Sequence, residues 1–280
     1  MATAIAHLGP RGTFSEQAAL AYQAWLQQQG QDLALTAYPS ILQAIQAVDQ
    51  GAVDLAIVPV ENSIEGSVAV TLDTLWQLDT LRIQQALVLP IRHSLITHAD
   101  NLAKLQTVYS HPQALGQCQQ WISRHCPQAT LVPMRSTTEA LEYLEKANTA
   151  AAIASEWAAD LYQLPVLARS INDQPDNCTK FWILGKSASV EGEHTSLAFS
   201  LPVNAPGALL RPLEIFAQTD INLSRIESRP TKRSLGEYLF FLDLEANLSA
   251  EQTRRSLQQL NRYTETLKLF GSYVTIAAGT

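Results

Sequence analysis

The sequence predicts an α/β protein in two parts, a two-lobed, doubly wound domain over residues 1–186 and a smaller ferredoxin-like βαββαβ domain over residues 194–280. In the first part, short runs rich in β-branched residues alternate with helical patterns, which is typical of mostly parallel sheets. In the second part, strands and helices follow the βαββαβ order. Residues 187–193 are small and polar without an apolar period, so we expect a linker there.

The elements of the first part fall into two groups, each large enough for one lobe. The first group has strands at 4–8, 33–37 and 55–60, helices at 14–29, 41–50 and 68–78, and an extended stretch at 83–97 that Pro90 interrupts. The second group has strands at 107–109, 130–133, 151–154 and 179–184, and helices at 112–125, 137–146 and 156–162. A cleft between two such lobes would suit a small ligand.

The last part of the chain predicts a four-stranded sheet with two helices. We expect its strands at 195–201, 222–228, 238–244 and 266–274, and its helices at 208–218 and 250–264. An RNA-binding sheet has the same order of elements, but its central strand starts with a basic residue and carries aromatics. The segment 236–243 has the aromatics without that basic start, so we place RNA binding well behind other roles.

The composition excludes several classes of protein. Hydrophobic residues make up 46% of the 280 residues and charged residues 16%, so a disordered chain is excluded. A net charge of −7 offers no basic surface to nucleic acid or to an anionic membrane. No apolar run is long enough to span a bilayer, and the first residues lack a signal-peptide pattern. We therefore expect a cytoplasmic protein whose partners are small molecules or further copies of itself.

Three predicted helices of the first domain begin with a capping box directly after a strand. These boxes are Thr13–Glu16, Ser110–Gln113 and Ser136–Glu139. Each one can be a plain helix cap. Together, however, they put free backbone N–H groups at the carboxyl ends of strands, where α/β proteins bind ligands. This arrangement favours a small carboxylate ligand. The turn at 9–13 lacks the ending of a phosphate-binding P-loop.

Two further segments place polar residues where an apolar strand ends or begins. Glu61, Asn62 and Ser63 end one strand, and Thr179 and Lys180 stand beside bulky aromatics at the start of another. A polar loop and a solvated strand start are the plain interpretations. Mixed donors and acceptors against apolar walls would instead suit a substrate with hydroxyl and carboxylate groups.

Cofactor motifs are missing from the sequence. It contains neither a Rossmann G-x-G-x-x-G nor an H-E-x-x-H motif, so we expect neither a redox cofactor nor a metal. The cysteines Cys118, Cys126 and Cys178 form no metal-type pair, and their number and spacing favour free thiols.

Taken together, these segments give the whole chain a resemblance to monofunctional prephenate dehydratases with a C-terminal ACT regulatory domain. The segments that carry it are 8–15, 58–66, 110–118, 177–181, 207–210 and 227–230, in this order. The resemblance implies conversion of prephenate to phenylpyruvate, water and CO₂ in phenylalanine biosynthesis. It also implies a two-lobed catalytic domain, similar to type II periplasmic binding proteins, with the active site in the cleft.

The resemblance also assigns roles to residues. The family's Thr-Arg-Phe motif falls on Thr179, Lys180 and Phe181, and its threonine is essential for activity. Lysine keeps the charge of the family's arginine but loses its bidentate fork. We expect Thr179 to donate a hydrogen bond or a proton to the departing hydroxyl, directly or through water or Glu61. The expected substrate-binding residues are Thr13, Glu61, Asn62, Ser63, Ser110, His111, Gln113, Thr137, Thr138, Asn177, Lys180 and Phe181.

For the second domain, the resemblance implies a phenylalanine site between the ACT domains of paired subunits. A helix N-terminus at Gly207 suits the carboxylate of the effector, and Asn222 its amino group. A homodimer or a dimer of dimers follows from such a site. The expected effector-binding residues are Gly207, Ala208, Leu209, Leu210, Asn222, Leu223, Glu227, Ser228, Arg229 and Pro230.

Three other functions stay open at this point. An arogenate dehydratase would act on the amino analogue of prephenate, and the sequence does not separate the two substrates. A non-catalytic amino-acid sensor could combine a binding-protein fold with an ACT module, and Lys180 is the one residue that favours it. An extracytoplasmic solute binder is disfavoured by the lack of an export signal.

Overall fold

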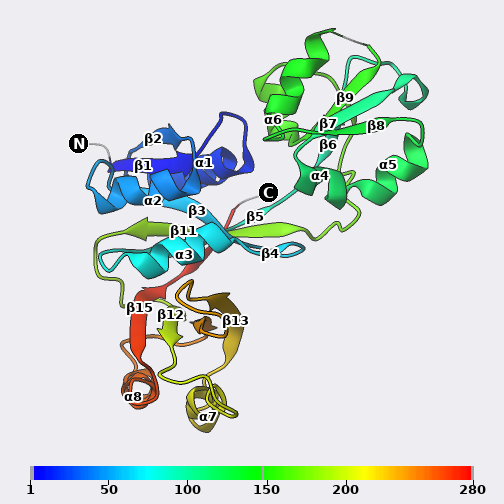
Figure 1. Ribbon diagram of the computed structural model, residues 1–280. Coiled ribbons are helices and arrows are strands. Elements are labelled where there is room, and N and C mark those ends of the chain that lie inside the picture. The colour runs from blue at the N-terminus through cyan, green and yellow to red at the C-terminus, as the bar shows by residue number, and fades with distance from the viewer. Residues whose placement is uncertain (1–2, 147, 279–280) are drawn as a thin grey trace.

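The computed structural model describes residues 3–146 and 148–278, which form three β-sheets with their helices. Two of the sheets belong to the two lobes of the first domain, and the third forms a separate body below the first lobe (Figure 1). Within the described residues, no helix has the length and apolar character needed to cross a membrane.

The first lobe is built on a mixed sheet. Its strands lie in the order β16 (Thr275–Ala277), β5 (Arg82–Pro90), β11 (Cys178–Gly185), β3 (Leu55–Asn62), β1 (Thr3–Leu8) and β2 (Leu33–Tyr38), with β4 (Gly66–Ser67) beside β3. Helix α1 (Phe14–Gln27) packs on one face of this sheet. Helices α2 (Ile41–Asp49) and α3 (Ala69–Gln77) pack on the other.

The second lobe has a smaller mixed sheet. Its strands lie in the order β10 (Val166–Ala168), β6 (Ser94–Ile96), β9 (Ala150–Ala154), β7 (Thr107–Ser110) and β8 (Thr130–Pro133). Its helices are α4 (Pro112–Gln117), α5 (Gln119–His125) and α6 (Glu156–Leu161), with short 3₁₀ helices η1 (Leu102–Lys104) and η2 (Glu139–Lys146). The helix expected over 112–125 is therefore divided at Cys118, and the helix expected over 137–146 is a 3₁₀ helix.

The two-lobed α/β architecture is confirmed, although antiparallel strands join the parallel ones. β1 is parallel to β2 and β3, and β7 to β8 and β9, as expected. β11, however, is antiparallel to both β3 and β5. The reason lies in the chain path, because the chain leaves the first lobe after β5 and returns to it in β11. Two strands that cross the same boundary in opposite senses must run antiparallel.

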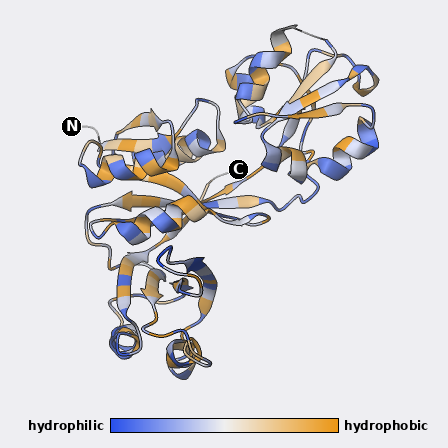
Figure 2. Ribbon diagram, in the orientation of Figure 1, coloured by the Kyte–Doolittle hydropathy of each residue, from blue (hydrophilic) through white to orange (hydrophobic). Residues whose placement is uncertain are grey.

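The third sheet has the predicted βαββαβ order. It consists of β12 (His194–Ser200), α7 (Leu210–Gln218), β13 (Leu223–Pro230), β14 (Tyr238–Leu244), α8 (Glu251–Leu260) and β15 (Thr266–Tyr273), with β13 at one edge of the sheet and β15 at the other. One face packs on α7 and α8. The other face shares a hydrophobic core with the first lobe, where Phe241 and Phe270 meet Trp182 of β11. Figure 2 shows the apolar colouring concentrated on the strands, in agreement with these shared cores.

The end of the chain departs from the expected domain boundary. β16 follows the third sheet in the chain but pairs in parallel with β5 of the first lobe, with Thr275 opposite Ala86. The expected linker is also tied to the third sheet, since Val190 forms an isolated bridge with Ser272. The described part of the predicted second domain, residues 194–278, is thus joined to the first lobe by main-chain hydrogen bonds as well as by side-chain packing.

Candidate active site

A cleft of ≈ 750 Å³ lies between the two lobes. Its walls include the start of α1, the end of β3, the start of β11, the start of α4 and the turn before η2. Eight of the predicted substrate-binding and catalytic residues line it, namely Thr13, Asn62, His111, Gln113, Thr137, Thr138, Thr179 and Phe181. Segments far apart in the sequence therefore meet in one cavity.

Thr179 stands at the centre of this arrangement. It lies opposite Asn62 in the pairing of β11 with β3, and its side chain is buried to 8% exposure. The side-chain amide of Asn62 donates to Thr179 Oγ1 over 2.9 Å. While Oγ1 accepts this bond, the hydroxyl of Thr179 can still donate its own hydrogen to a ligand.

Asn62 is held in place by a buried chain of amides that joins the lobes. Its Nδ2 also donates to Asn177 Oδ1 over 2.9 Å, and Asn177 Nδ2 donates to Gln117 Oε1 over 2.8 Å. Gln117 belongs to α4 of the second lobe, and its Oε1 lies 3.0 Å from His93 Nε2. A satisfied network of this kind fixes the orientation of its members. The position of Asn62, and with it that of Thr179, therefore depends on both lobes.

His93 is a neutral member of this network. Burial lowers the pKa of its imidazole, and the hydrogen bond to Gln117 opposes that shift only in part. A neutral ring that donates from Nε2 leaves Nδ1 as an acceptor. Within the described part of the chain, His93 Nδ1 is buried without a hydrogen-bond partner.

Two of the three predicted helix caps at the cleft, Thr13 and Ser136, are present, whereas the cap expected from Ser110 is not. Thr13 Oγ1 accepts from the backbone N–H of Glu16 over 3.3 Å and caps α1. In the second turn, the cap is His111 rather than Ser110, because His111 Nδ1 accepts from the Gln113 N–H over 3.3 Å. Burial lowers the pKa of His111, and nearby Glu65 opposes that effect.

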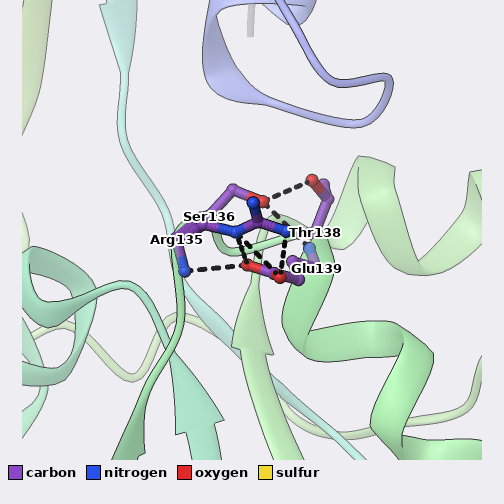
Figure 3. A network of polar contacts seen from close by, with 4 residues as sticks. All are labelled: Arg135, Ser136, Thr138 and Glu139. Atoms are coloured by element: carbon purple, nitrogen blue, oxygen red, sulfur yellow. Dashed lines mark hydrogen bonds and ion pairs between the residues drawn. The ribbon is translucent and has the colours of Figure 1, made fainter.

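The third turn carries the polar network of Figure 3. Ser136 Oγ accepts from the Glu139 N–H over 3.0 Å and lies 3.1 Å from Thr138 Oγ1. Arg135 Nη2 donates to Glu139 Oε1 over 2.9 Å. The carboxylate of Glu139 thereby neutralises the one arginine that lines the cleft among the described residues. Thr137 and Thr138 line the cleft beside this network.

The turn at 9–13 also meets the second lobe. Gly12 has a φ of +89°, and a Cβ atom there would lie 2.7 Å from Thr138 Cγ2. Tyr162 of the second lobe donates from its hydroxyl to the Arg11 carbonyl over 3.1 Å. Glycine at position 12 thus allows the two lobes to approach at one side of the cleft.

Two predicted binding residues, Lys180 and Glu61, lie away from the cleft. Successive residues of a strand point to opposite faces of its sheet, so Lys180 faces away from Thr179 and Phe181. Its Nζ lies 3.1 Å from Asp243 Oδ2 of the third sheet. Glu61 is paired with Lys180, one residue before Asn62, and belongs to that same outer face. The expected clamp by Lys180 and relay through Glu61 are therefore wrong.

Three other predicted residues support the site without lining it. Ser110 is fully buried and donates to the Ile153 carbonyl over 2.6 Å, which ties β7 to β9. Ser63 Oγ accepts from the Cys178 N–H over 3.0 Å at the start of β11. Asn177 takes part in the amide network described above. These side chains position strands rather than contact a ligand in the cleft.

Several residues of the cleft were not predicted from the sequence. The main ones are Phe14, His93, Gln117 and Tyr162. Gln117 falls four residues beyond the end of the capping box at Gln113, on the buried side of α4. His93 lies between β5 and β6, where the chain crosses between lobes, and no motif in the sequence marks that crossing.

The predicted effector residues occupy two parts of the third sheet's domain. Gly207 has a φ of +80° in an exposed turn, three residues before α7 begins at Leu210. Ala208 is half-buried, Leu209 and Leu223 pack against the domain core, and Asn222 is exposed. Glu227, Ser228 and Pro230 lie on the edge strand β13.

Arg229 differs from the expectation for an effector ligand. Its guanidinium donates to both carboxylate oxygens of Asp73 in α3, each over 3.1 Å. Burial alone would raise the pKa of Asp73, but hydrogen bonds from Arg229 and Lys232 outweigh it and hold the pKa below its ordinary value. Arg229 is thus committed to the contact between β13 and the first lobe.

The fold and the cleft define a class of protein, a two-lobed α/β enzyme domain joined to a βαββαβ domain. Family comparison agrees, since the prephenate dehydratase model matches residues 5–189 and the ACT domain model matches residues 195–262. The chain belongs to the prephenate dehydratase family.

Individual relatives agree over almost the full chain. A prephenate dehydratase of Lactococcus lactis is 37% identical over 98% of this chain and 99% of its own. The structure of the Arthrobacter aurescens prephenate dehydratase in complex with L-Phe has a TM-score of 0.87, with 32% identity over 97% of this chain and 90% of its own. A structure described as a novel type of quorum-quenching acylase has a TM-score of 0.79, with 26% identity over 98% of both chains.

Proposed function

We propose that residues 1–186 catalyse the conversion of prephenate to phenylpyruvate, water and CO₂, and that residues 194–280 regulate this reaction in response to L-phenylalanine. The observation that carries the catalytic proposal is the hydrogen bond from Asn62 to Thr179 in a cleft shared by both lobes. The hydroxyl of Thr179 thereby accepts from Asn62 and can donate its own hydrogen to a ligand in the cleft.

The proposed reaction needs little more than orientation and charge stabilisation. The C–C bond to the ring carboxylate breaks, and its electron pair aromatises the ring as the ring C–O bond breaks. The departing hydroxide takes a proton and becomes water. A threonine hydroxyl is a weak acid, so the proposed role of Thr179 is to polarise the leaving oxygen by a hydrogen bond, with the proton supplied through water.

The remaining cleft residues suit the two carboxylates of the substrate. Backbone N–H groups at the turns capped by Thr13, His111 and Ser136 offer donors without a permanent positive charge. Phe14 and Phe181 supply apolar walls for the ring. Because Glu139 pairs with Arg135, we assign the binding of the carboxylates to these turns rather than to a lysine or arginine clamp.

The regulatory proposal rests on the ACT domain and its exposed edge strand β13. A similar structure is a complex with L-Phe. We propose that phenylalanine binds across a homodimer, or a dimer of dimers, formed along this edge in a cytoplasmic enzyme. The effector ligands would be the turn at Gly207 and the exposed residues of β13, without Arg229.

The test compares prephenate with arogenate, its amino analogue, as substrates of the purified full-length chain. We expect phenylpyruvate from prephenate, with a kcat/KM roughly tenfold or more above that for arogenate, a ratio worth about 1.4 kcal/mol. A preference for arogenate would identify the protein as an arogenate dehydratase instead. Failure to act on either substrate, from folded protein, would contradict the proposed function.

A further inference from the structure

A buried group of charges joins the third sheet to β11, on the face opposite the cleft. Asp243 of β14 is 1% exposed, and its Oδ2 lies 3.1 Å from Lys180 Nζ and 3.2 Å from Arg225 Nε. Ser196 Oγ donates to Asp243 Oδ1 over 2.5 Å. Burial would raise the pKa of Asp243, but the charges of Arg225 and Lys180 hold it below its ordinary value. The group is therefore a carboxylate shared by two cations.

Arg225 is the member of this group whose hydrogen-bond donors are not satisfied. Its guanidinium stacks over the ring of Trp182, 5.3 Å from the ring centroid, and is 7% exposed. Within the described residues, none of its three side-chain nitrogens makes a hydrogen bond of good geometry. Buried donors without acceptors are costly. Arg225 and Lys180 thus share one oxygen of Asp243, and of the two only Lys180 makes a hydrogen bond to it.

The position of these residues along their strands links two sites. Lys180 directly follows Thr179, so one strand presents one side chain to the cleft and the next to Asp243. Arg225 lies on β13, the strand whose exposed residues are proposed to bind the effector. Every step from β13 to Thr179 is thus a contact or a peptide bond.

We propose that Arg225, Asp243 and Lys180 transmit phenylalanine binding on β13 to Thr179, with Lys180 as a positioning residue. This inference rests on the proposed function. In one arrangement Lys180 holds Asp243 and keeps β11 in register with the Asn62 side chain. In the other, Arg225 takes Asp243 over, Lys180 is released, and Thr179 moves relative to Asn62. The effector shifts the population between these two arrangements.

The test uses two lysines that both join the ACT sheet to the first lobe. Lys180→Met removes the charge next to Thr179 and leaves Asp243 paired with Arg225. Lys268→Met is the matched control, because Lys268 is 19% exposed against 21% for Lys180 and contacts Asp79 and Trp76 of the first lobe without touching β11. For each protein, turnover of prephenate is measured with and without phenylalanine, and phenylalanine binding is measured by calorimetry.

We expect Lys180→Met to bind phenylalanine, but the factor by which phenylalanine lowers its turnover should be at least tenfold smaller than in the wild type. Lys268→Met should keep the wild-type factor. A merely structural role of Lys180 would change turnover without separating binding from inhibition. Equal inhibition of Lys180→Met and the wild type would overturn the inference and leave the proposed function intact. A wild type that turns over prephenate but ignores phenylalanine would refute both the regulatory proposal and this route.

A second measurement needs no variant and covers the case in which Lys180→Met does not fold. Hydrogen exchange of the backbone amides of β11 is compared in wild-type protein with and without saturating phenylalanine. We expect the exchange rates at Lys180 and Trp182 to change by at least a few-fold. Unchanged rates throughout β11, with phenylalanine shown to be bound, would contradict the proposed route.

Discussion

At the scale of single residues, the hydrogen bond between Asn62 and Thr179 is the centre of the site. Asn62 receives its orientation from Asn177 and passes it to Thr179, so three buried side chains place one hydroxyl. Oγ1 accepts from this amide, and the hydroxyl can still donate its hydrogen to a ligand. A residue that is a weak acid can thus stabilise a leaving oxygen by a positioned hydrogen bond.

Removal of this donor should abolish most of the activity. We expect Thr179→Val, which keeps the shape and loses the hydroxyl, to reduce kcat on prephenate by about 10²- to 10⁴-fold, the range for a group that assists proton transfer. Thr179→Ser is the matched control and should retain most of the wild-type rate. Steady-state kinetics of the three proteins checks this, and a Thr179→Val enzyme with wild-type turnover would refute the role of the hydroxyl.

His93 predicts a dependence of stability on pH. Its pKa is lowered by burial from about 6.5, so the unfolded chain binds more protons than the folded one below that pH. The stability that His93 contributes is complete above about pH 6.5 and is lost as the pH falls. One group can contribute a slope of at most about 1.4 kcal/mol per pH unit.

The measurement is urea denaturation of the wild type and His93→Gln at about pH 7 and about pH 5. We expect the free energy of unfolding to fall less steeply in His93→Gln. A residual slope should remain, since burial also lowers the pKa of His111. Identical slopes in both proteins would show that His93 is not a neutral buried group.

The sequence predicts Thr179, Lys180 and Phe181 in one site, but Lys180 does not belong to it. Strand alternation places Lys180 on the face of the sheet opposite Thr179 and Phe181. The sequence does not show that another sheet covers this opposite face. That face is covered by the third sheet, whose packing involves Asp243 and Arg225 from residues far along the chain. A local pattern carries no information on such a contact.

At the scale of elements, the three turns that begin α1, α4 and η2 converge on the cleft. The capping boxes identified all three from the sequence. They did not show which side chain makes the cap, because His111 replaces Ser110 once Ser110 is drawn into the contact with Ile153. Nor did they show that η2 is a 3₁₀ helix. A cap can be predicted from local sequence. Whether a neighbouring strand takes the hydroxyl that would form the cap depends on the folded structure.

The turn at Gly12 offers a test at this scale. Gly12→Ala faces a left-handed φ of +89° and a Cβ 2.7 Å from Thr138 Cγ2 of the other lobe. Gly30→Ala faces a φ of +76° with no atom within 4 Å of the new Cβ. Both variants should lose about 1–2 kcal/mol of stability from backbone strain.

The two glycine variants should differ in catalysis. Since Gly12→Ala displaces the lobes around the cleft, we expect its kcat/KM to fall roughly 10- to 100-fold, while Gly30→Ala keeps the wild-type value. Thermal unfolding and steady-state kinetics of the pair provide the check. Equal kcat/KM in the two variants would mean that the contact of Gly12 with the second lobe does not shape the site.

At the scale of the whole molecule, the two domains are more closely joined than the sequence indicates. The order of the elements predicted a two-lobed domain followed by a βαββαβ domain, and both are present. The sequence did not predict that β16 returns to β5, because three residues carry no distinctive pattern and the available edge of β5 exists only in the folded lobe. The ACT domain is connected to the first lobe by three kinds of contact. These are main-chain pairing, the core around Trp182 and the ion pair of Arg229 with Asp73.

The proposed function is tested most directly by one titration of the wild-type chain with phenylalanine, in which prephenate turnover and phenylalanine binding are followed on the same sample. We expect phenylpyruvate formation to decline in step with the occupancy of the phenylalanine site, to a small fraction of the starting rate. Absence of phenylpyruvate from protein that is folded and binds phenylalanine would contradict it, because the cleft between the lobes would then not be a prephenate dehydratase site.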